Sequence, residues 1–228
     1  MPSTVPSTAK GRATRERIVR AAVELVAERG VAAVSLDDVG ARARASRSQL
    51  YHYFEDKDAL IRAVVNATGE AVLAAQEKLL EHLDSWAGLD RWLDALVELQ
   101  RGRQARGGCP IGSLVGQLAE RDPLARTAIA AGFDRWEARL RDGLIRIQER
   151  GELAADAEPA ALANATMASV QGGLLLTQVR RDPEQLRTAL NASRTLLHSY
   201  RVGGEGSEIT GRPLLTSSTP RAIDLLPC

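Results

Sequence analysis

The sequence predicts an all-α fold of about nine helices, and two observations carry this prediction. Apolar residues recur every three or four positions through most of the 228-residue chain, whereas the alternation typical of β-strands is almost absent. The same helix-start signal, an acidic residue followed by proline, recurs at Asp122-Pro123, Glu158-Pro159 and Asp182-Pro183. Because an acid caps the free amides of a helix and proline fits its first turn, each pair predicts the start of a helix.

Composition excludes several classes of protein. The chain is 44% apolar and 26% charged, which is ordinary for a globular protein. No apolar run approaches the roughly 18 residues that cross a bilayer, and segment 1–9 lacks the apolar core of a secretory signal. The two cysteines, Cys109 and Cys228, are too few for a disulfide framework. We therefore expect a cytoplasmic protein that makes no membrane contact.

Global charge gives no sign of a polyanionic partner, but one local cluster does. The chain has 30 basic and 29 acidic residues, a formal net charge of +1. In one short segment, however, three arginines precede three aromatic side chains with no acid between them, a combination suited to phosphate and base contacts. These residues are Arg42, Arg44, Arg47, Tyr51, His52 and Tyr53.

Four helices are expected in the N-terminal third. Ser35, Ser46 and Asp56 are good N-caps, and Gly30 supplies the positive φ that ends many helices. The second and third helices, joined only by Arg44-Ala45, predict a helix-turn-helix unit, although the spacing alone also fits a plain helical hairpin inside a bundle. The expected helices cover residues 12–29 or 14–29, 36–43, 47–54 and 57–83.

The remaining chain predicts longer helices separated by breaks. The pair Gly107-Gly108 interrupts the pattern, and Pro110 suits the first position of the helix that follows. Gly151 is expected to stop another helix, and the chain beyond Gly203 is expected to be mobile because Gly, Ser, Thr and Pro dominate it. The other expected helices cover residues 90–103, 124–150, 160–180 and 184–201.

The most specific motif runs from Ser46 to Phe54, where a Leu-Tyr pair precedes a Tyr-Phe pair, and Asp56-Lys57 follows closely. Together with Arg17–Gly30 and Val34–Val39, this motif resembles the DNA-binding domain of the TetR/AcrR family of transcriptional regulators. Gly108–Leu114 is similar to a segment of one subgroup of that family. The resemblance favours a helix-turn-helix over a plain hairpin.

The resemblance also implies a division of the chain. We expect a three-helix N-terminal helix-turn-helix domain that binds DNA and a C-terminal helical domain that binds an effector and dimerises. The expected parts are a disordered arm (1–11), the DNA-binding domain (12–62), the effector-binding and dimerisation domain (63–202) and a flexible tail (203–228).

The helix after Ser46 is expected to enter the major groove of a double-stranded DNA operator. Arg47 suits guanine and Gln49 suits adenine, although either could hold phosphate instead. By similarity to the family, tyrosines and Lys57 donate to phosphates, while His52 either faces DNA or satisfies a core hydrogen bond. The expected DNA-binding residues are Ser35, Arg44, Ser46, Arg47, Ser48, Gln49, Tyr51, His52, Tyr53 and Lys57.

One position departs from the family pattern. Many relatives carry glycine where this chain has Arg44, in the turn between the two short helices. A left-handed backbone there costs arginine roughly 1 kcal/mol. Either the turn takes another shape, or Arg44 accepts the strain because its side chain reaches phosphate.

A homodimer is expected, because two reading helices about 34–36 Å apart can span successive major grooves. The family pairs its last two helices as a four-helix bundle, and Gly172-Gly173 would let helices approach closely there. The alternative is that these residues lie wholly inside one subunit. The expected interface residues are Gly172, Gly173, Leu174, Leu186, Leu190, Arg194 and Leu197.

The resemblance further implies a small apolar or aromatic effector that is bound between the C-terminal helices. The scarce aromatic residues concentrate there, although aromatic residues at helical spacing are more often ordinary core. The expected pocket residues are Trp92, Leu96, Cys109, Ile111, Phe133, Trp136, Leu140, Met167 and Gln171.

The leading hypothesis is a repressor that a small-molecule effector releases from a palindromic operator. One alternative is an oxidant- or electrophile-sensing repressor that uses Cys109. A helix start would lower the pKa of this thiol, and so would the nearby Arg101, Arg103 and Arg106. The same cysteine also fits a small buried apolar position. Another alternative is a helical protein-interaction module. An enzyme is not expected, nor any cofactor or metal, because the histidines are scattered and no phosphate-binding glycine loop follows a strand.

Overall fold

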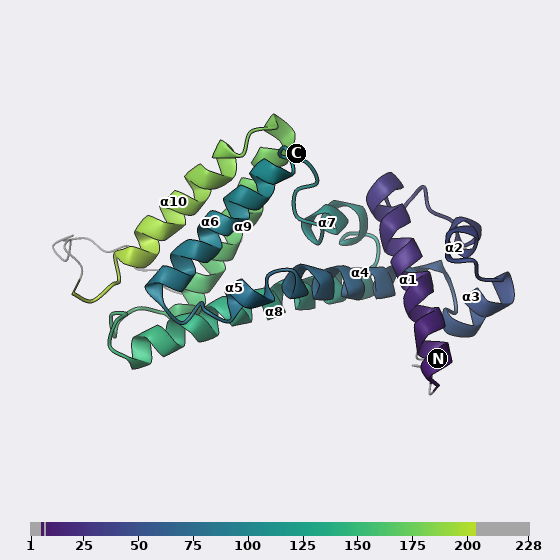
Figure 1. Ribbon diagram of the computed structural model, residues 1–228, viewed down its shortest axis with the longest axis horizontal. Helices are drawn as coiled ribbons and strands as arrows, with labels where there is room; N and C mark the ends of the chain where they lie inside the picture. Colours follow the sequence, from purple (N-terminus) through teal and green to yellow (C-terminus); the bar gives the residue numbers. More distant parts are fainter. Residues whose placement is uncertain (1–5, 7, 204–228) are drawn as a thin grey trace.

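The computed structural model describes residues 6 and 8–203, and the described chain is all-α (Figure 1). Apart from one isolated antiparallel bridge between Leu153 and Arg201, the described residues form helices and connecting loops. The helices are α1 (Ala9–Arg29), α2 (Leu36–Ala43), α3 (Arg47–Tyr53), α4 (Lys57–Ala74), α5 (Glu77–Leu80), α6 (Trp86–Gly102), α7 (Gly112–Leu118), α8 (Pro123–Glu149), α9 (Pro159–Arg180) and α10 (Glu184–His198).

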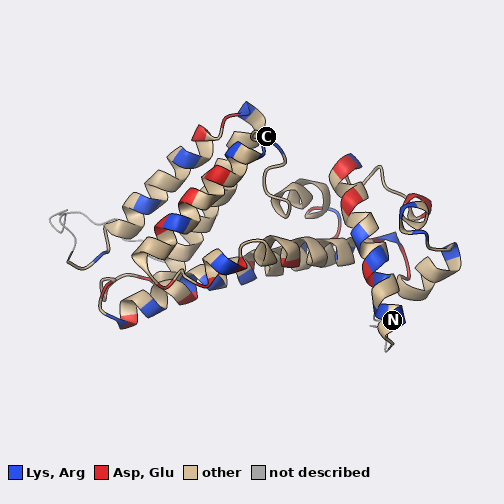
Figure 2. Cartoon of the chain, viewed as in Figure 1, with Lys and Arg blue, Asp and Glu red and all other residues tan. Residues whose placement is uncertain are grey.

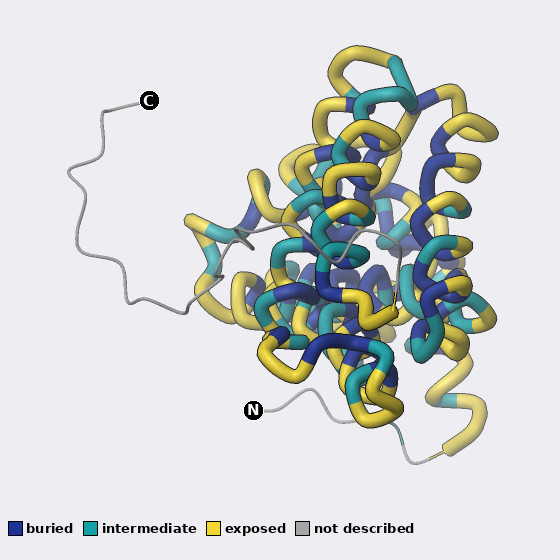
Figure 3. The backbone as a smooth tube through the Cα atoms, turned by 90° about the vertical axis from the view of Figure 1, so that its left-hand side faces the viewer, coloured by how far each residue is buried: buried dark blue, intermediate teal, exposed yellow. Residues whose placement is uncertain are grey.

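The helices form two groups joined by a long pair. The short helices α2 and α3 pack with α1 at one end of the molecule, and α6, α9 and α10 form a bundle at the other (Figure 1). Helices α4 and α8 lie side by side and connect the two groups; α7 packs on α8 and lies between the bundle and α1. Figure 3 shows buried and exposed turns alternating along the helices, as amphipathic helices require.

The N-terminal core forms along one face of α1. Ile18, Ala22 and Leu25 are fully buried, and they pack in one core with Leu50 and Phe54 from the helix-turn-helix segment. The Arg17 guanidinium fastens α1 to this segment, since its Nε donates to the Ala43 carbonyl at 2.9 Å. Leu50 and Phe54 are therefore core residues and not surface contacts.

Helix α1 begins at Ala9, three residues before the earlier of the two predicted starts and five before the later one. Thr8 caps it, because its hydroxyl accepts a hydrogen bond from the Gly11 amide at 3.1 Å. The expected disordered arm therefore overlaps α1 at residues 9–11, and most of the rest of the arm lies outside the described residues. The tail beyond Gly203 also lies outside them.

The fourth predicted helix, 57–83, is divided, so the described chain has ten helices instead of nine. Helix α4 ends at Ala74 because Gln76 leaves the helical conformation, with φ −113° and ψ 0°. The Gln76 amide folds back to donate to the Val72 carbonyl at 3.0 Å and accepts from the Trp92 indole at 3.0 Å. A tertiary contact stabilises this break. The sequence therefore shows no local signal for it, such as a glycine or a proline.

Two helix starts also differ from the prediction. Helix α6 begins at Trp86 instead of Asp90, because the Ser85 hydroxyl accepts from the Gly88 amide at 3.1 Å. Helix α7 begins at Gly112, so Pro110 precedes it and the prediction of Pro110 at its first position is wrong.

The acid–proline pairs behave differently from one another. Asp122 caps α8 as predicted, whereas Glu158 precedes α9 without a capping hydrogen bond. Asp182 accepts from the Glu184 amide at 3.0 Å, but Pro183 occupies the N-cap position of α10.

Helix α10 ends at His198, three residues before the predicted end. The chain is drawn into pairing with the α8–α9 loop, where the Ala154 amide donates to the Tyr200 carbonyl at 2.8 Å and the Val202 amide donates to the Glu152 carbonyl at 2.9 Å. Gly151, with φ 74°, follows the end of α8 as expected.

None of the helices in the described part of the chain combines the length and apolar character that spanning a bilayer requires. The same residues hold no group of three or more His, Cys, Asp or Glu side chains arranged to bind a metal ion.

Candidate nucleic-acid interface and effector cavities

Helix α3 presents a polar surface to solvent. A reciprocal capping box starts it: the Gln49 amide donates to the Ser46 hydroxyl at 3.2 Å, and the Ser46 amide donates to Gln49 Oε1 at 2.9 Å. Of its seven residues only Leu50 is buried, and its first turn exposes Arg47 and Ser48. The predicted reading positions are therefore exposed and held by a fixed helix start.

The turn before α3 takes the strained form. Arg44 has φ 49° and ψ 47°, the left-handed conformation that favours glycine, so the alternative of a different turn shape is excluded. The turn is held by the Ala45 amide, which donates to the Gly40 carbonyl at 2.9 Å. The Arg44 side chain itself is exposed.

Arg47 lies along α3 over the ring of Tyr51. Its guanidinium carbon is 5.9 Å from the ring centroid, and a hydrogen bond to Tyr51 is the main cause that raises the pKa of Arg47, with attraction by Asp37 adding to it. Tyr51 is 48% exposed. A guanidinium and a phenol thus stand together at the solvent edge of the helix.

His52 faces solvent, so the alternative in which it satisfies a core hydrogen bond is wrong. Its ring meets that of Tyr53 edge-on, with centroids 4.8 Å apart. Tyr53 and Lys57 are half-buried, and Lys57 is the first residue of α4, where free amides favour an anion. Ser35 is exposed, but its hydroxyl already bonds to Asp38 in the capping box of α2.

The basic cluster read from the sequence is smaller in three dimensions. Arg42 turns toward α1 and pairs with Glu28 at 2.9 Å and with Glu24 at 3.3 Å. These contacts raise the pKa of Arg42, and the hydrogen bond from Arg42 lowers the pKa of Glu28. Figure 2 shows acidic residues near the end of α1. The sequence segment holds no acid, but the tertiary structure supplies two.

A cavity of about 350 Å³ lies where α1 and α4 meet the C-terminal group. Among the predicted pocket residues, Leu96, Cys109 and Trp136 line it. The sequence analysis did not predict the other lining residues. Their only signal in the sequence is that polar residues, such as Gln76 and Gln100, interrupt an apolar helix face. The full lining is Val23, Thr68, Ala71, Val72, Ala75, Gln76, Leu96, Leu99, Gln100, Arg103, Gly108, Cys109, Pro110, Trp136 and Leu174.

A second cavity, of about 380 Å³, adjoins the first at Cys109 and is lined by the predicted residues Phe133 and Gln171. The other predicted pocket residues do not line either cavity. They are buried core side chains: Trp92, Ile111, Leu140 and Met167.

Cys109 is buried, and burial raises the pKa of its thiol. Backbone amides at the start of α7 oppose this shift without reversing it, and the Gly112 amide donates to Sγ at 3.3 Å. The prediction that the helix start and the upstream arginines lower this pKa is therefore wrong. Arg101 instead pairs with Glu98 and with Glu184, the latter at 3.1 Å.

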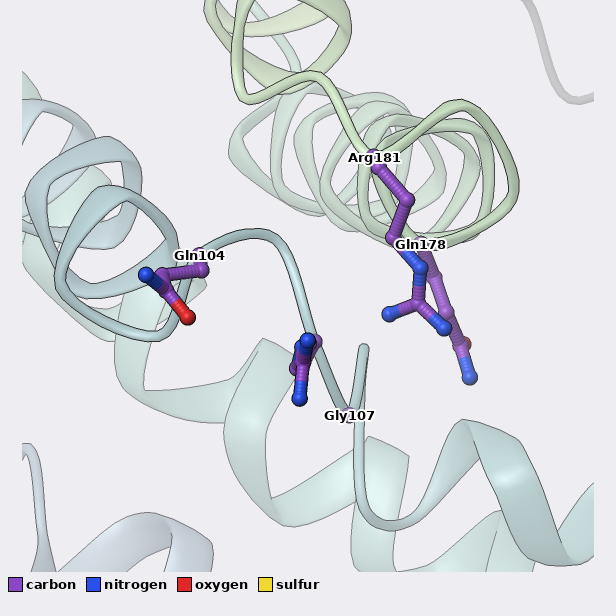
Figure 4. A pocket seen from close by; sticks show the side chains of 5 residues that line it. Gln104, Gly107, Gln178 and Arg181 are labelled. Atoms are coloured by element: carbon purple, nitrogen blue, oxygen red, sulfur yellow. The ribbon is translucent and has the colours of Figure 1, made fainter.

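A third, open cleft of about 500 Å³ lies between the α6–α7 loop and the end of α9 (Figure 4). Arg181 adopts a left-handed conformation, φ 54°, and donates to the Ala105 carbonyl at 3.2 Å. Gln104, Arg106, Gly107 and Gln178 complete the lining.

The predicted dimer seam is largely internal. Gly173 packs against α10, because a Cβ built on it would lie 2.8 Å from Leu186 Cδ1. Arg194 pairs with Asp90 at 2.9 Å and with Asp94. The apolar seam residues are buried within the one chain, so the seam prediction is wrong for them; they are Leu174, Leu186, Leu190 and Leu197.

The exposed apolar surface of α9 lies beside the predicted seam. Leu175 is 61% and Val179 is 72% exposed, and Leu176 is exposed with them. Gly172 is exposed too, and no atom lies within 4 Å of a Cβ built on it. These four residues follow the i, i+3, i+4, i+7 spacing of one helix face, so they form one stripe, here called the α9 stripe.

Comparison with known proteins matches both halves of the chain. The family described as "Bacterial regulatory proteins, tetR family" matches residues 18–64, and "Tetracyclin repressor-like, C-terminal domain" matches residues 85–193. An uncharacterised HTH-type transcriptional regulator of Mycobacterium tuberculosis is 32% identical over 198 residues, which cover 80% of this chain and 93% of the relative. The HTH-type transcriptional repressor DhaR of Mycobacterium sp. strain GP1 is 26% identical over 174 residues, covering 75% and 86%.

The fold has a similar counterpart among solved structures. A TetR-family transcriptional regulator from Cytophaga hutchinsonii superposes with a TM-score of 0.74 at 18% identity, covering 87% of this chain and 100% of that one. The curated relatives are transcriptional regulators and not enzymes. With an exposed helix-turn-helix, matches to both domains and a 32% identical relative along most of its length, this chain belongs to the TetR family of DNA-binding transcriptional regulators.

Proposed function

We propose that the protein is a dimeric repressor that binds a palindromic operator through α3 and is released when a small molecule fills the cavity between its domains. The observation that carries the proposal is the exposed polar face of α3, which the start of α4 follows directly in the chain. Residues 12–62 bind DNA, and residues 63–202 hold the effector and the dimer interface. A cytoplasmic location, where bacterial DNA lies, follows from this function.

At the DNA, Arg47 and Ser48 read base edges from the first turn of α3, while Tyr51 and Tyr53 hold phosphates. Arg47 can leave Tyr51 for guanine, since both groups are exposed. Gln49 has a smaller role, because its Oε1 already serves the helix cap and a bidentate contact to adenine would break that bond. The remaining predicted contacts, Ser35, Arg44, Ser46, His52 and Lys57, surround this centre.

The dimer forms through the α9 stripe. Exposed leucines and a valine in one row, beside a glycine that lets another helix approach, are what a helix–helix interface requires. Two subunits joined there present two copies of α3 to successive major grooves.

Helix α4 carries the effector signal. Its first residue, Lys57, lies at the DNA-binding end, and Val72, near its other end, lines the 350 Å³ cavity. At 1.5 Å per residue the two positions are about 22 Å apart. The cavity also touches α1 through Val23, so filling it displaces both helices that support α3.

A thiol switch at Cys109 is the weaker alternative, because a buried thiol with a raised pKa holds little reactive thiolate at neutral pH. We assign Cys109 instead to the shared wall of the two cavities. A helical protein-interaction module is disfavoured because α3 exposes phosphate-binding groups and almost no apolar side chain.

The test starts with selection of bound duplexes from a random pool. The selected operator is then titrated at several salt concentrations with the parent, with an Arg47→Ala, Tyr51→Phe variant and with an Arg106→Ala control. The double variant should lose affinity while remaining dimeric, and the control should not. Full affinity in the double variant would remove α3 from the interface.

The interface is tested separately. Val179→Glu changes an exposed side chain, so the chain should fold normally and sediment as a monomer with weak operator affinity. A Val179→Glu protein that remains dimeric places the seam elsewhere.

A further inference from the structure

We propose that the 350 Å³ cavity takes a small organic acid: an apolar or aromatic body with one anionic carboxylate and a hydroxyl or amide group. This inference rests on the proposed function only in taking the cavity as the effector site. The size and the mainly apolar wall suit a small molecule. The charge and hydrogen-bonding groups of the wall define its chemical class.

Charge comes first. Arg103 is the one ionisable side chain besides Cys109 in the cavity lining, and no carboxylate accompanies it there. Among the described residues its guanidinium has no ion pair and no hydrogen-bond acceptor, in contrast to Arg101, which meets Glu98 and Glu184. Arg103 is exposed as well as lining the cavity, so it stands at the mouth. A free guanidinium beside an apolar cavity selects an anion, and a carboxylate fits it with two parallel hydrogen bonds.

Two buried polar atoms give the second requirement. Gln100 Oε1 and Trp136 Nε1 are buried without a hydrogen-bond partner, and both side chains, each 2% exposed, line the cavity. Buried polar groups are normally satisfied, so each such exception calls for a reason. The exceptions here are one acceptor and one donor, which a ligand hydroxyl or amide can satisfy together.

Other polar groups of the same wall are already satisfied. Gln76 donates to the Val72 carbonyl and accepts from Trp92, each at 3.0 Å, and the Thr68 hydroxyl donates to the Val64 carbonyl at 2.8 Å. The unpaired atoms are therefore specific to Gln100 and Trp136 and do not extend to Gln76 and Thr68.

The test measures direct binding by calorimetry, without DNA. The probes are 4-hydroxybenzoate, 4-hydroxyphenylacetate and 4-hydroxycinnamate, which separate carboxylate and hydroxyl by different lengths, and the methyl ester of each. At least one acid should bind about tenfold or more tightly than its ester, because the ester cannot form charged hydrogen bonds. Arg103→Gln should abolish this preference. Arg106→Gln, which changes an exposed arginine in the same loop that lines the third cleft, should preserve it.

Gln100→Leu tests the second requirement. It should weaken the hydroxy acid several-fold and leave the deoxy analogue, such as benzoate for 4-hydroxybenzoate, unchanged. If no acid binds better than its ester, or Arg103→Gln and Arg106→Gln behave alike, the organic-acid site is refuted.

Operator release is measured in parallel, so the two proposals fail differently. Acids that bind in the cavity without releasing the operator overturn the effector mechanism and leave the site intact. Release by neutral compounds alone, with no binding of acids, overturns the ligand class and leaves the mechanism intact.

Discussion

The side-chain oxygen of Gln117 on α7 accepts a hydrogen bond from the backbone amide of Val31, just after α1, at 2.8 Å. The other end of the same amide group donates to the Ser113 carbonyl at 2.9 Å. Helix α7 begins beside Cys109, which lines both C-terminal cavities. Gln117 thus joins the helix that follows the cavities to the helix that supports the DNA-binding unit.

This contact predicts a change in coupling. Gln117→Ala leaves the Val31 amide without its acceptor, so the coupling between effector and operator should weaken by about 1 kcal/mol, roughly fivefold. The measurement is the ratio of operator affinities with and without effector. Gln117→Glu is the matched control, since its carboxylate still accepts from Val31 and only the bond to Ser113 is lost. An unchanged ratio in Gln117→Ala would mean that α7 does not transmit the signal.

The strained turn predicts a trade between stability and binding. Arg44→Gly relieves the left-handed backbone and should raise the free energy of unfolding by about 1 kcal/mol. Because the arginine is also expected to hold a phosphate, operator affinity should fall and the salt slope should shrink by about 1. Arg181→Gly changes a second left-handed arginine outside the DNA-binding helices and should leave operator affinity unaltered. Equal affinity in parent and Arg44→Gly would show that Arg44 holds no phosphate.

Substitutions at Gln49 can separate its role in capping α3 from its predicted role in contacting DNA. Gln49→Glu retains an acceptor for the Ser46 amide and adds a negative charge in the first turn of α3, so thermal stability should be kept. Operator affinity should fall, since the carboxylate repels the DNA. Gln49→Ala removes the acceptor of the Ser46 amide, keeps the Ser46 hydroxyl cap, and should cost up to about 1 kcal/mol of stability. Melting curves and operator titrations are compared for both variants, and a marked loss of stability in Gln49→Glu contradicts the capping argument.

The adjacent glycines of α9 should respond in opposite ways. A Cβ at position 173 meets Leu186 and Ala189 at 2.8–3.1 Å, so Gly173→Ala should destabilise the fold by about 1–3 kcal/mol. Within its own chain Gly172→Ala has open space, so in the monomeric Val179→Glu background it should stabilise the helix by about 0.5–1 kcal/mol. Chemical denaturation measures both. Similar effects at the two positions would contradict the close α9–α10 packing.

Burial of Cys109 predicts slow labelling and a pH-dependent stability. In a Cys228→Ser background, a soluble alkylating reagent should modify the folded protein far more slowly than the denatured chain at neutral pH. The pKa of the folded thiol lies above its unfolded value, so its contribution to stability is complete below the unfolded pKa. That contribution is lost as the pH rises toward the folded pKa. Denaturation at a series of alkaline pH values, with Cys109→Ser as control, checks the direction, and rapid labelling at neutral pH would restore the thiol-switch alternative.

The sequence by itself determined the local structure and the position of the helix-turn-helix. Serine and aspartate caps, acid–proline pairs and apolar periodicity act over a few residues, so they fixed α2, α3 and α8 closely. The motif around Leu50 and Phe54 placed the helix-turn-helix correctly, because its core residues and exposed residues alternate within one short segment.

Only the tertiary structure decided which side chains contact other helices of the same chain and which stay exposed. The seam leucines are buried because α9 and α10 pack on each other, Arg42 is neutralised by acids from α1, and Gln76 breaks a helix to reach Trp92. Each outcome depends on a contact between segments distant in sequence. A periodic pattern shows that a helix face is buried, but it does not show which other helix covers that face. The cavity and its unpaired Gln100 and Trp136 atoms therefore become visible only when the helices are assembled.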